Sequence, residues 1–347
     1  MQKTKIAFLY SEVAGYFLAC AKELAKNDDV LIVRWPVNKE APFLLDEEAN
    51  YQMVDKSDYS LPQLSKLLKD FNPDILVCSG WMDKDYLKVA KGFNKKIPIV
   101  LTLDNHWTGS AKQRLLCLLS NFYLKRIFTH AWVPGDVQKQ YAEKLGFKGK
   151  VVKNFYCADA PLFQEIYKRT FENKQNNVPK RFLYVARYVE HKGIFEMWEA
   201  FVQLQKENPS EWELLCLGTG DEWDSRVEHE KIKHIGFVQP TELEKYIAES
   251  SVYILPSKFE PWGVTVQEFA ICGLPLLLSD AIGANEKYLK ENGIEFKSGS
   301  VEEIKKAMKA IMQMTDEDLI EMGRKSHELG VSFTPTDWAN NARSFKL

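Results

Sequence analysis

Residues 259–275, FEPWGVTVQEFAICGLP, are the stretch around which the fold is organised, and they lie between two runs of apolar residues. We interpret the order as strand, loop, short helix, turn and strand, with Gly263 near the start of the helix and Gly273 at its end. The first turn of a helix offers unpaired N–H groups and the positive end of the helix dipole, so this loop is suited to bind an anion. Glu260 lies in the loop and Glu268 within the helix, where both are placed to face one ligand.

Length and composition restrict the class of protein. A chain of 347 residues exceeds what one hydrophobic core usually supports, so two domains are expected. A net charge of −2 gives no bulk attraction to nucleic acid, and no nucleic-acid-binding signature is present, so no nucleic-acid partner is expected. The six cysteines are scattered singly, which indicates buried thiols in a reducing compartment. The apolar run at the N-terminus is too short for a signal peptide or a membrane span, so we expect a cytoplasmic protein.

Apolar strands alternate with amphipathic helices along both halves of the chain. In the first half the expected strands are 6–10, 30–33, 75–78, 97–103, 131–133 and 151–152. In the second half they are 182–186, 212–217, 235–238, 252–255 and 276–278. This alternation predicts an α/β fold with parallel sheets wrapped by helices.

The domain boundaries follow from where this alternation lapses. We expect a Rossmann-like domain over 1–155 and a second one over 181–335. The segment 156–180 is predicted to be a linker, because its periodicity is weak and it ends in a polar run. A final helix is expected over 336–347.

Two cations and a glycine turn follow strands of the second half. Arg187 and Lys192 come after the strand 182–186 and before a helix, which is where open α/β sheets bind ligands. They are placed to clamp a diphosphate; two solvated surface charges are the alternative. Gly218 belongs to the turn LGTGD, which lacks the third glycine of a dinucleotide fingerprint and is best interpreted as a tight turn.

The first half offers weaker candidates. Gly15 follows the first strand and would let the backbone approach a phosphate, although alone it is only a loop glycine. Asp104 and His106 follow the strand 97–103 and are placed to act on an acceptor hydroxyl as base or hydrogen-bond partner. A structural role for His106 is the alternative.

The segment 111–127, AKQRLLCLLSNFYLKRI, carries four cations and no acid. Its composition is that of a helix lying on an anionic membrane surface. A core helix with cations at its ends explains the same pattern, and both interpretations remain open. The six histidines are dispersed, no acidic ligand loop is evident, and no metal site is expected.

Taken together, the second-half residues resemble, in order and approximate spacing, the C-terminal half of GT-B glycosyltransferases. The subgroup is the retaining family 4, also called glycosyltransferase group 1, and the resemblance covers roughly residues 180–300. The residues that carry it are Arg187, Lys192, Gly218, Gly220, Gly236, Phe237, Val238, Glu260 and Glu268.

The resemblance implies two Rossmann-like domains facing a central cleft, with a nucleotide-sugar donor held by the second. Arg187 and Lys192 would contact the donor diphosphate, Glu260 the hydroxyls of the donor sugar, and Glu268 the ribose hydroxyls.

Further roles are implied for the flanking backbone. Backbone around Trp262, Gly263 and Val264 would meet phosphate, and the base would lie near Phe237 and Val238. The donor would be UDP- or GDP-linked, with no cofactor and no metal.

The acceptor side is less defined. Relatives often place a histidine directly after the strand that ends near Leu103, whereas Asp104 and Asn105 precede His106 here, so Asp104 is a rival. A glycan or lipid-linked acceptor in surface polysaccharide or glycoconjugate synthesis is expected, with the final helix crossing back to the first domain. The competing hypotheses are a catalytically silent GT-B-like subunit that binds a partner enzyme, a sugar-nucleotide epimerase or phosphorylase, and a Rossmann dehydrogenase, which the incomplete glycine fingerprint disfavours.

Overall fold

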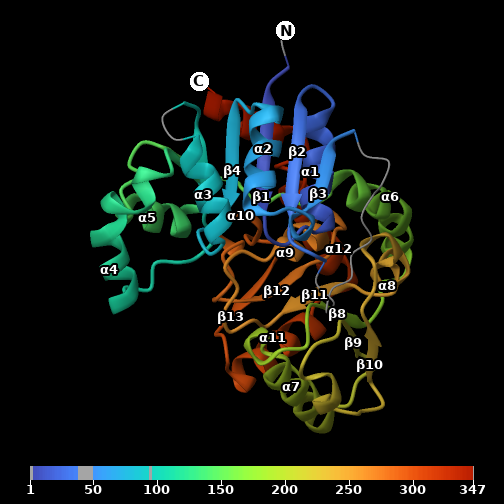
Figure 1. The fold of residues 1–347 in the computed structure, drawn as a ribbon. Coiled ribbons are helices and arrows are strands. Elements are labelled where there is room, and N and C mark those ends of the chain that lie inside the picture. The colour runs from blue at the N-terminus through green and yellow to red at the C-terminus, as the bar shows by residue number, and fades with distance from the viewer. Residues whose placement is uncertain (1–2, 38–49, 94–95, 347) are drawn as a thin grey trace. The chain divides into compact units, whose positions relative to one another are not determined.

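The computed structural model describes residues 3–37, 50–93 and 96–346, which form two α/β units (Figure 1). Unit 1 consists of residues 1–159 and 333–347, and unit 2 of residues 160–332. The expected first domain, 1–155, includes 1–2, 38–49 and 94–95, and the expected last helix includes Leu347; these positions lie outside the described residues.

The described part of unit 1 contains a seven-stranded parallel sheet in the order β3-β2-β1-β4-β5-β6-β7. Its strands are β1 Lys5–Tyr10, β2 Asp29–Arg34, β3 Gln52–Asp55, β4 Ile75–Ser79, β5 Ile99–Thr102, β6 His130–Trp132 and β7 Val151–Val152. Its helices are α1 Gly15–Ala25, α2 Leu61–Phe71, α3 Lys84–Gly92, α4 Ala111–Leu119, α5 Asp136–Lys144 and α13 Pro335–Arg343.

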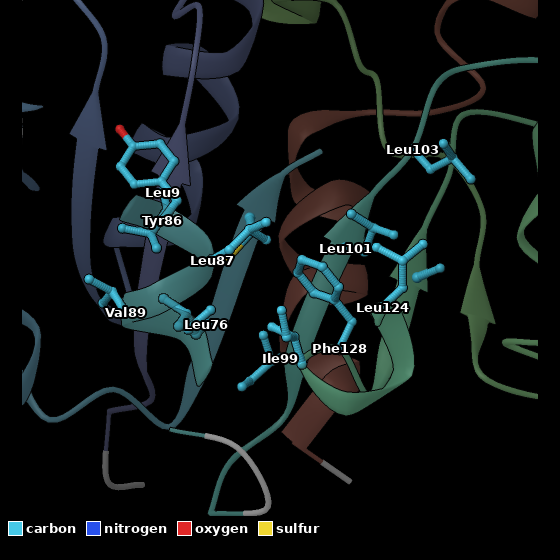
Figure 2. Close-up of a cluster of buried hydrophobic side chains, with 14 of the residues drawn as sticks. Leu9, Leu76, Tyr86, Leu87, Val89, Ile99, Leu101, Leu103, Leu124 and Phe128 are labelled. Atoms are coloured by element: carbon cyan, nitrogen blue, oxygen red, sulfur yellow. The ribbon is translucent and has the colours of Figure 1, made fainter. Parts of the chain in front are cut away.

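The inner strands of unit 1 are apolar along most of their length because helices cover both faces of the sheet. Alternate residues of β1 therefore belong to two different hydrophobic clusters, Leu9 to one and Phe8 to the other. Figure 2 shows the first cluster, in which Leu124 and Phe128 approach Ile99 and Leu101 of β5.

The described part of unit 2 contains a six-stranded parallel sheet in the order β10-β9-β8-β11-β12-β13. Its strands are β8 Arg181–Val185, β9 Glu213–Leu217, β10 Ile232–Gly236, β11 Val252–Leu255, β12 Leu276–Ser279 and β13 Gly293–Phe296. Its helices are α6 Ala160–Asn176, α7 Ile194–Glu207, α8 Glu244–Ala248, α9 Val264–Ile271, α10 Asn285–Tyr288, α11 Val301–Met312 and α12 Asp316–Gly330. Both units are thus Rossmann-like domains with parallel sheets.

Two expectations about unit 2 are wrong. The segment 156–180, expected as a linker, forms α6, which packs against α8, α9 and α12. The strand expected over 235–238 is β10, Ile232–Gly236, so Phe237 and Val238 follow its end instead of lying within it. Gly236 has a φ of 88°, which turns the chain out of the strand at that point.

The segment 111–126 is also different from the expected long helix. α4 ends at Leu119 and is followed by two 3-10 turns, η2 Ser120–Phe122 and η3 Leu124–Arg126. No residue of α4 itself is buried, but Leu116 and Cys117 pack against a core cluster that includes Leu124 and Ile127. The interpretation of 111–127 as a core helix therefore holds for only part of the segment. The final helix, α13, belongs to unit 1 and packs against α1.

Candidate functional site

The loop that joins β11 to α9 is fixed to the loop after β12. The Glu260 N–H donates to Ala281 O (3.2 Å) and the Gly283 N–H to Glu260 O (3.1 Å), which forms a short parallel bridge. Gly263 precedes α9 with a φ of 92°, a conformation that glycine adopts without strain. The Trp262 side chain is 2% exposed, so the loop presents its backbone, and not this indole, at the start of α9.

An ion pair joins this loop to the loop after β8. The Lys192 ammonium contacts Glu260 Oε2, and the two side chains are only 15% and 13% exposed. Ser257 Oγ donates to the same oxygen at 3.4 Å. The structure therefore brings together two of the residues that the sequence singled out, although they lie far apart in the chain.

The close approach of these two loops depends on Gly193. Its φ is 69°, and a Cβ atom built on it would lie 2.1 Å from Pro256 O. The Lys258 N–H also donates to His191 O at 2.8 Å. The backbone of the two loops, and not only the ion pair, holds Lys192 near Glu260.

Arg187 lies at the carboxyl end of β8, is exposed, and accepts a hydrogen bond from the Tyr184 hydroxyl on its carbonyl oxygen (2.9 Å). Partial burial lowers the pKa of His191, and the charges of Lys192 and Arg187 lower this pKa further. Arg187 and Lys192 thus both act on one imidazole, and these two cations form a positive region at this end of the sheet, a setting that favours a bound anion.

The glycine turn after β9 contacts the loop that carries Arg187. Gly218 has a φ of 138°, and a Cβ there would lie 2.0 Å from Ala186 O. The Tyr188 N–H donates to Thr219 O at 2.9 Å. Gly218 therefore permits a close contact between two loops, in addition to making the turn.

Glu268 is half-buried in the middle of α9, one turn beyond Thr265. Burial raises the pKa of Tyr253, and the negative charges of Glu260 and Glu268 both raise it further, so the two carboxylates lie near the same phenol. The Tyr253 hydroxyl donates to Thr265 Oγ1 at 2.8 Å. The charges of both glutamates thus act on one buried phenol.

Phe237 and Val238 line a pocket of about 690 Å³ in unit 2. α6 contributes Arg169, whose guanidinium forms an ion pair with Glu244 (3.0 Å), and the other described lining residues are Thr170, Asn173, Ile235, Glu242, Lys245, Tyr246 and Ala248. Among the residues described, this lining does not include Arg187, Lys192, Glu260 or Glu268. The pocket is therefore a neighbouring feature of unit 2, separate from the ion pair.

The remaining predicted residues lie in unit 1 at the carboxyl end of its sheet. Asp104 Oδ2 accepts a hydrogen bond from the Tyr156 hydroxyl (3.1 Å), and burial together with the Asp104 charge raises the pKa of Tyr156. His106 accepts a hydrogen bond from Gln113 Nε2 on its carbonyl oxygen (2.7 Å). Gly15 is the first residue of α1. We call Gly15, Asp104 and His106 the second group of candidate residues.

Sequence reasoning missed three contributors to the two groups. Nothing in the sequence indicated that Tyr253 and Tyr156 belong to these groups. An apolar strand and an irregular loop do not show that one hydroxyl donates to Thr265 and the other to Asp104. Ser257 lies two residues after the end of β11, at the sheet edge where ligands bind, and that position was a usable signal.

The described part of the chain contains neither a cluster of metal-ligating side chains nor a helix that could cross a membrane. No group of three or more His, Cys, Asp and Glu side chains there is arranged to hold a metal ion. None of its helices combines the length and the apolar character needed to cross a bilayer.

Residues 167–326 match the family described as Glycosyl transferases group 1. Among curated proteins, a glycogen synthase of Mycobacterium tuberculosis is 26% identical over 141 residues, which is 39% of this chain and 34% of the relative. The N,N'-diacetylbacillosaminyl-diphospho-undecaprenol alpha-1,3-N-acetylgalactosaminyltransferase of Campylobacter jejuni is 23% identical over 253 residues, 64% of this chain and 63% of the relative. The chain spans about a third of the length of the first of these relatives.

Solved structures agree over nearly the whole chain. A glycosyltransferase from Rickettsia africae superimposes with a TM-score of 0.75 at 12% identity, covering 99% of this chain and 98% of the other. HepE from Anabaena, in complex with UDP, superimposes with a TM-score of 0.71 at 17% identity, covering 98% of both chains. At these identities the likeness concerns the fold alone. The chain therefore has the two-domain fold of GT-B glycosyltransferases, and residues 167–326, within its unit 2, match the glycosyl transferases group 1 family.

Proposed function

We propose that the protein is a retaining glycosyltransferase of family 4. It moves a sugar from a UDP- or GDP-linked donor to a glycan or lipid-linked acceptor in surface polysaccharide or glycoconjugate synthesis. The observation that carries the proposal is the half-enclosed Lys192–Glu260 pair beside the start of α9. The names of the relatives, a glycogen synthase and an N-acetylgalactosaminyltransferase, and the UDP bound by HepE support the same class of reaction.

The proposed role of the positive region is to hold the donor diphosphate. Arg187 and Lys192 would stabilise the charge that grows on the departing diphosphate. Backbone N–H groups at Gly263 and Val264 would add hydrogen bonds at the positive end of α9. With this charge supplied by side chains and backbone, we propose a metal-independent reaction.

The two glutamates are proposed to bind hydroxyls. A carboxylate accepts hydrogen bonds from a pair of hydroxyls, and Tyr253 lies near both carboxylates. Glu260 would bind the donor sugar and Glu268 the ribose. The base would lie near Phe237 and Val238, which follow the end of β10.

The acceptor is proposed to bind to unit 1. Asp104, oriented by the Tyr156 hydroxyl, would accept a hydrogen bond from the attacking hydroxyl, with His106 as the second candidate. Gly15 would let backbone approach the donor. Retention of configuration implies attack from the leaving-group face, with a phosphate oxygen of the donor as base.

We also propose a cytoplasmic location, peripheral to the inner face of a membrane. Six free cysteines, five of them buried, fit a reducing compartment. A lipid-linked acceptor would be presented to the protein at such a surface.

The Glu268→Ala variant tests the donor site. Loss of charge-assisted hydrogen bonds to the ribose should raise the Kd for UDP or GDP by roughly tenfold or more, since such bonds contribute about 1.5–3 kcal/mol. Calorimetric titration of each nucleotide measures this. Glu291→Ala is the control, because Glu291 is 86% exposed on the same unit.

Unchanged nucleotide affinity and donor turnover in Glu268→Ala would reject the role given to Glu268. The alternatives are a catalytically silent subunit and a sugar-nucleotide epimerase. A thermal-shift assay with a panel of nucleotides tests for the silent subunit, because no nucleotide should stabilise such a protein. Recovery of an isomerised nucleotide-sugar, without transfer, would identify the epimerase.

A further inference from the structure

α4 and the turn after it expose a continuous apolar stripe. Its five side chains are between 47% and 74% exposed: Leu115, Leu118, Leu119, Phe122 and Tyr123. Leu115, Leu118 and Leu119 share one side of α4 by their spacing of three and four residues, and Phe122 and Tyr123 follow at the end of the 3-10 turn η2. Large apolar side chains that gather in this way, unlike single exposed ones, mark an interaction site.

The inner side of the same segment is firmly packed. Leu124 is fully buried and Phe128 is 2% exposed, and both belong to the cluster drawn in Figure 2. Ser120 is 1% exposed and its hydroxyl donates to Leu145 O at 2.6 Å. The apolar stripe therefore lies on the outward side of the segment, opposite the packed side. Unit 1 could bury the stripe only by breaking the contacts of Leu124, Phe128 and Ser120.

Basic residues border the stripe. Lys112, Arg114, Lys125 and Arg126 are exposed on the same segment, and no acidic residue occurs between Asn105 and Gly135 in the sequence. On the neighbouring α5, Lys144 lies over the Trp107 ring at 5.0 Å, and its charge also acts on the Cys117 thiol of α4.

The acids nearest to this surface along the chain lie on α5. Asp136 pairs with Lys153 (3.0 Å) and Glu143 faces Lys139 (3.9 Å). The combination of exposed apolar side chains and exposed cations matches an anionic lipid surface, in which the former enter the interface and the latter meet headgroup phosphates.

We propose that this surface, which we name the α4 patch (residues 112–126), docks the protein on an anionic phospholipid bilayer. The proposal rests on the proposed function for its purpose, since the patch follows Asp104 and His106 in unit 1 and would bring a lipid-linked acceptor to that group. A second copy of the chain fits the patch less well, because a symmetric contact would set the same cations against each other. Nucleic acid would leave the apolar stripe in water.

Vesicle co-sedimentation tests the α4 patch directly. The whole protein should bind vesicles of equal parts phosphatidylcholine and phosphatidylglycerol, release from them as salt is raised, and bind pure phosphatidylcholine vesicles at least tenfold more weakly. Leu118→Glu with Phe122→Glu should lower the partition coefficient on the anionic vesicles by at least tenfold. Lys112→Glu with Lys125→Glu should do the same, because each cation near such a surface contributes roughly fivefold.

Matched controls separate docking from general surface changes. Met82→Glu removes an apolar side chain that is 80% exposed elsewhere in unit 1, and Lys69→Glu with Lys91→Glu reverses two exposed cations of α2 and α3. These controls should bind vesicles like the unaltered protein, and the melting temperatures of all variants should agree.

Three outcomes would overturn the proposal: equal binding by patch and control variants, equal binding to both kinds of vesicle, or a salt-insensitive self-association in light scattering that the patch variants abolish. The last would identify a second copy as the occupant. Nucleotide affinity, measured on the same samples, is independent of vesicle binding, so a failure of the glycosyltransferase proposal would be seen separately.

Discussion

A single glycine holds the two loops of the candidate donor site together. A Cβ on Gly193 would lie 2.1 Å from Pro256 O, and the φ of 69° is itself unfavourable for alanine. Gly193→Ala should therefore separate the Lys192 loop from the Glu260 loop. We expect a loss of about 2–4 kcal/mol in the free energy of unfolding, measured by denaturant titration, together with weaker nucleotide binding.

Gly299 provides the control for backbone conformation. Its φ is 71°, nearly that of Gly193, but no atom lies within 4 Å of a Cβ built there. Gly299→Ala should cost only about 1 kcal/mol, the effect of the left-handed conformation alone. Equal losses in the two variants would show that contact with Pro256 does not matter.

At the residue scale the sequence indicated which charged side chains lie together better than it indicated their hydrogen-bond partners. Lys192 and Glu260 were both identified because each follows a strand at the carboxyl edge of one parallel sheet, where such loops converge. The contact of Tyr156 with Asp104 could not be predicted, because it depends on which way an irregular loop turns. The roles of the individual side chains toward a donor remain predictions.

Among the elements, α6 shows why a helix can be mistaken for a linker. Its buried positions are Ala160, Phe163, Ile166, Thr170, Phe171 and Lys174, which follow helical spacing. Thr170 and Lys174 are polar, however, so the second half of the helix shows no apolar periodicity. Most sheet strands were easier to predict because fully buried parallel strands are continuous apolar runs. The strands β3 and β13 were not predicted, because they are only partly buried and carry polar residues.

The buried Lys174 of α6 makes the free energy of unfolding depend on pH. Its ammonium nitrogen has no hydrogen-bond partner among the described residues, and burial lowers its pKa to about 7. A lysine in the unfolded chain has a pKa of about 10.4, so the unfolded state binds more protons between these values. The free energy of unfolding should therefore rise as the pH increases from about 7 towards about 10, and the penalty should be fully present below pH 7.

Lys174→Met tests this account, because methionine keeps much of the side-chain volume without a charge. At pH 7 the free energy of unfolding of the variant should be about 1–4 kcal/mol higher than that of the unaltered protein. Its free energy of unfolding should also change less between pH 7 and pH 10. Lys168→Met on the same helix is the control, since Lys168 is 66% exposed. A pH profile identical to that of the unaltered protein would show that Lys174 is not the titrating group.

At the scale of the whole molecule, the chain both begins and ends in unit 1. α13 returns to pack on α1, and its Trp338 is 1% exposed, with its indole N–H donating to Phe155 O at 2.6 Å. The Trp338 ring lies 5.8 Å from that of Phe8 and 4.8 Å from that of Trp132. The core of unit 1 is thus completed by its last helix, whereas unit 2 is formed by one continuous segment, 160–332.

Trp338→Ala should consequently destabilise unit 1 and leave unit 2 intact. Removing this buried side chain should cost about 3–5 kcal/mol, because the cavity left among Phe8, Trp132 and Phe155 cannot close fully. Hydrogen exchange should show faster exchange of the amides of β1 and β5 and unchanged protection of β8 and β11. Asn340→Ala, at an exposed position of the same helix, should change neither. Nucleotide affinity should persist, since the residues proposed to bind the donor diphosphate and ribose lie in unit 2. If the amides of β8 and β11 lost protection together with those of β1 and β5, the two units would unfold as one.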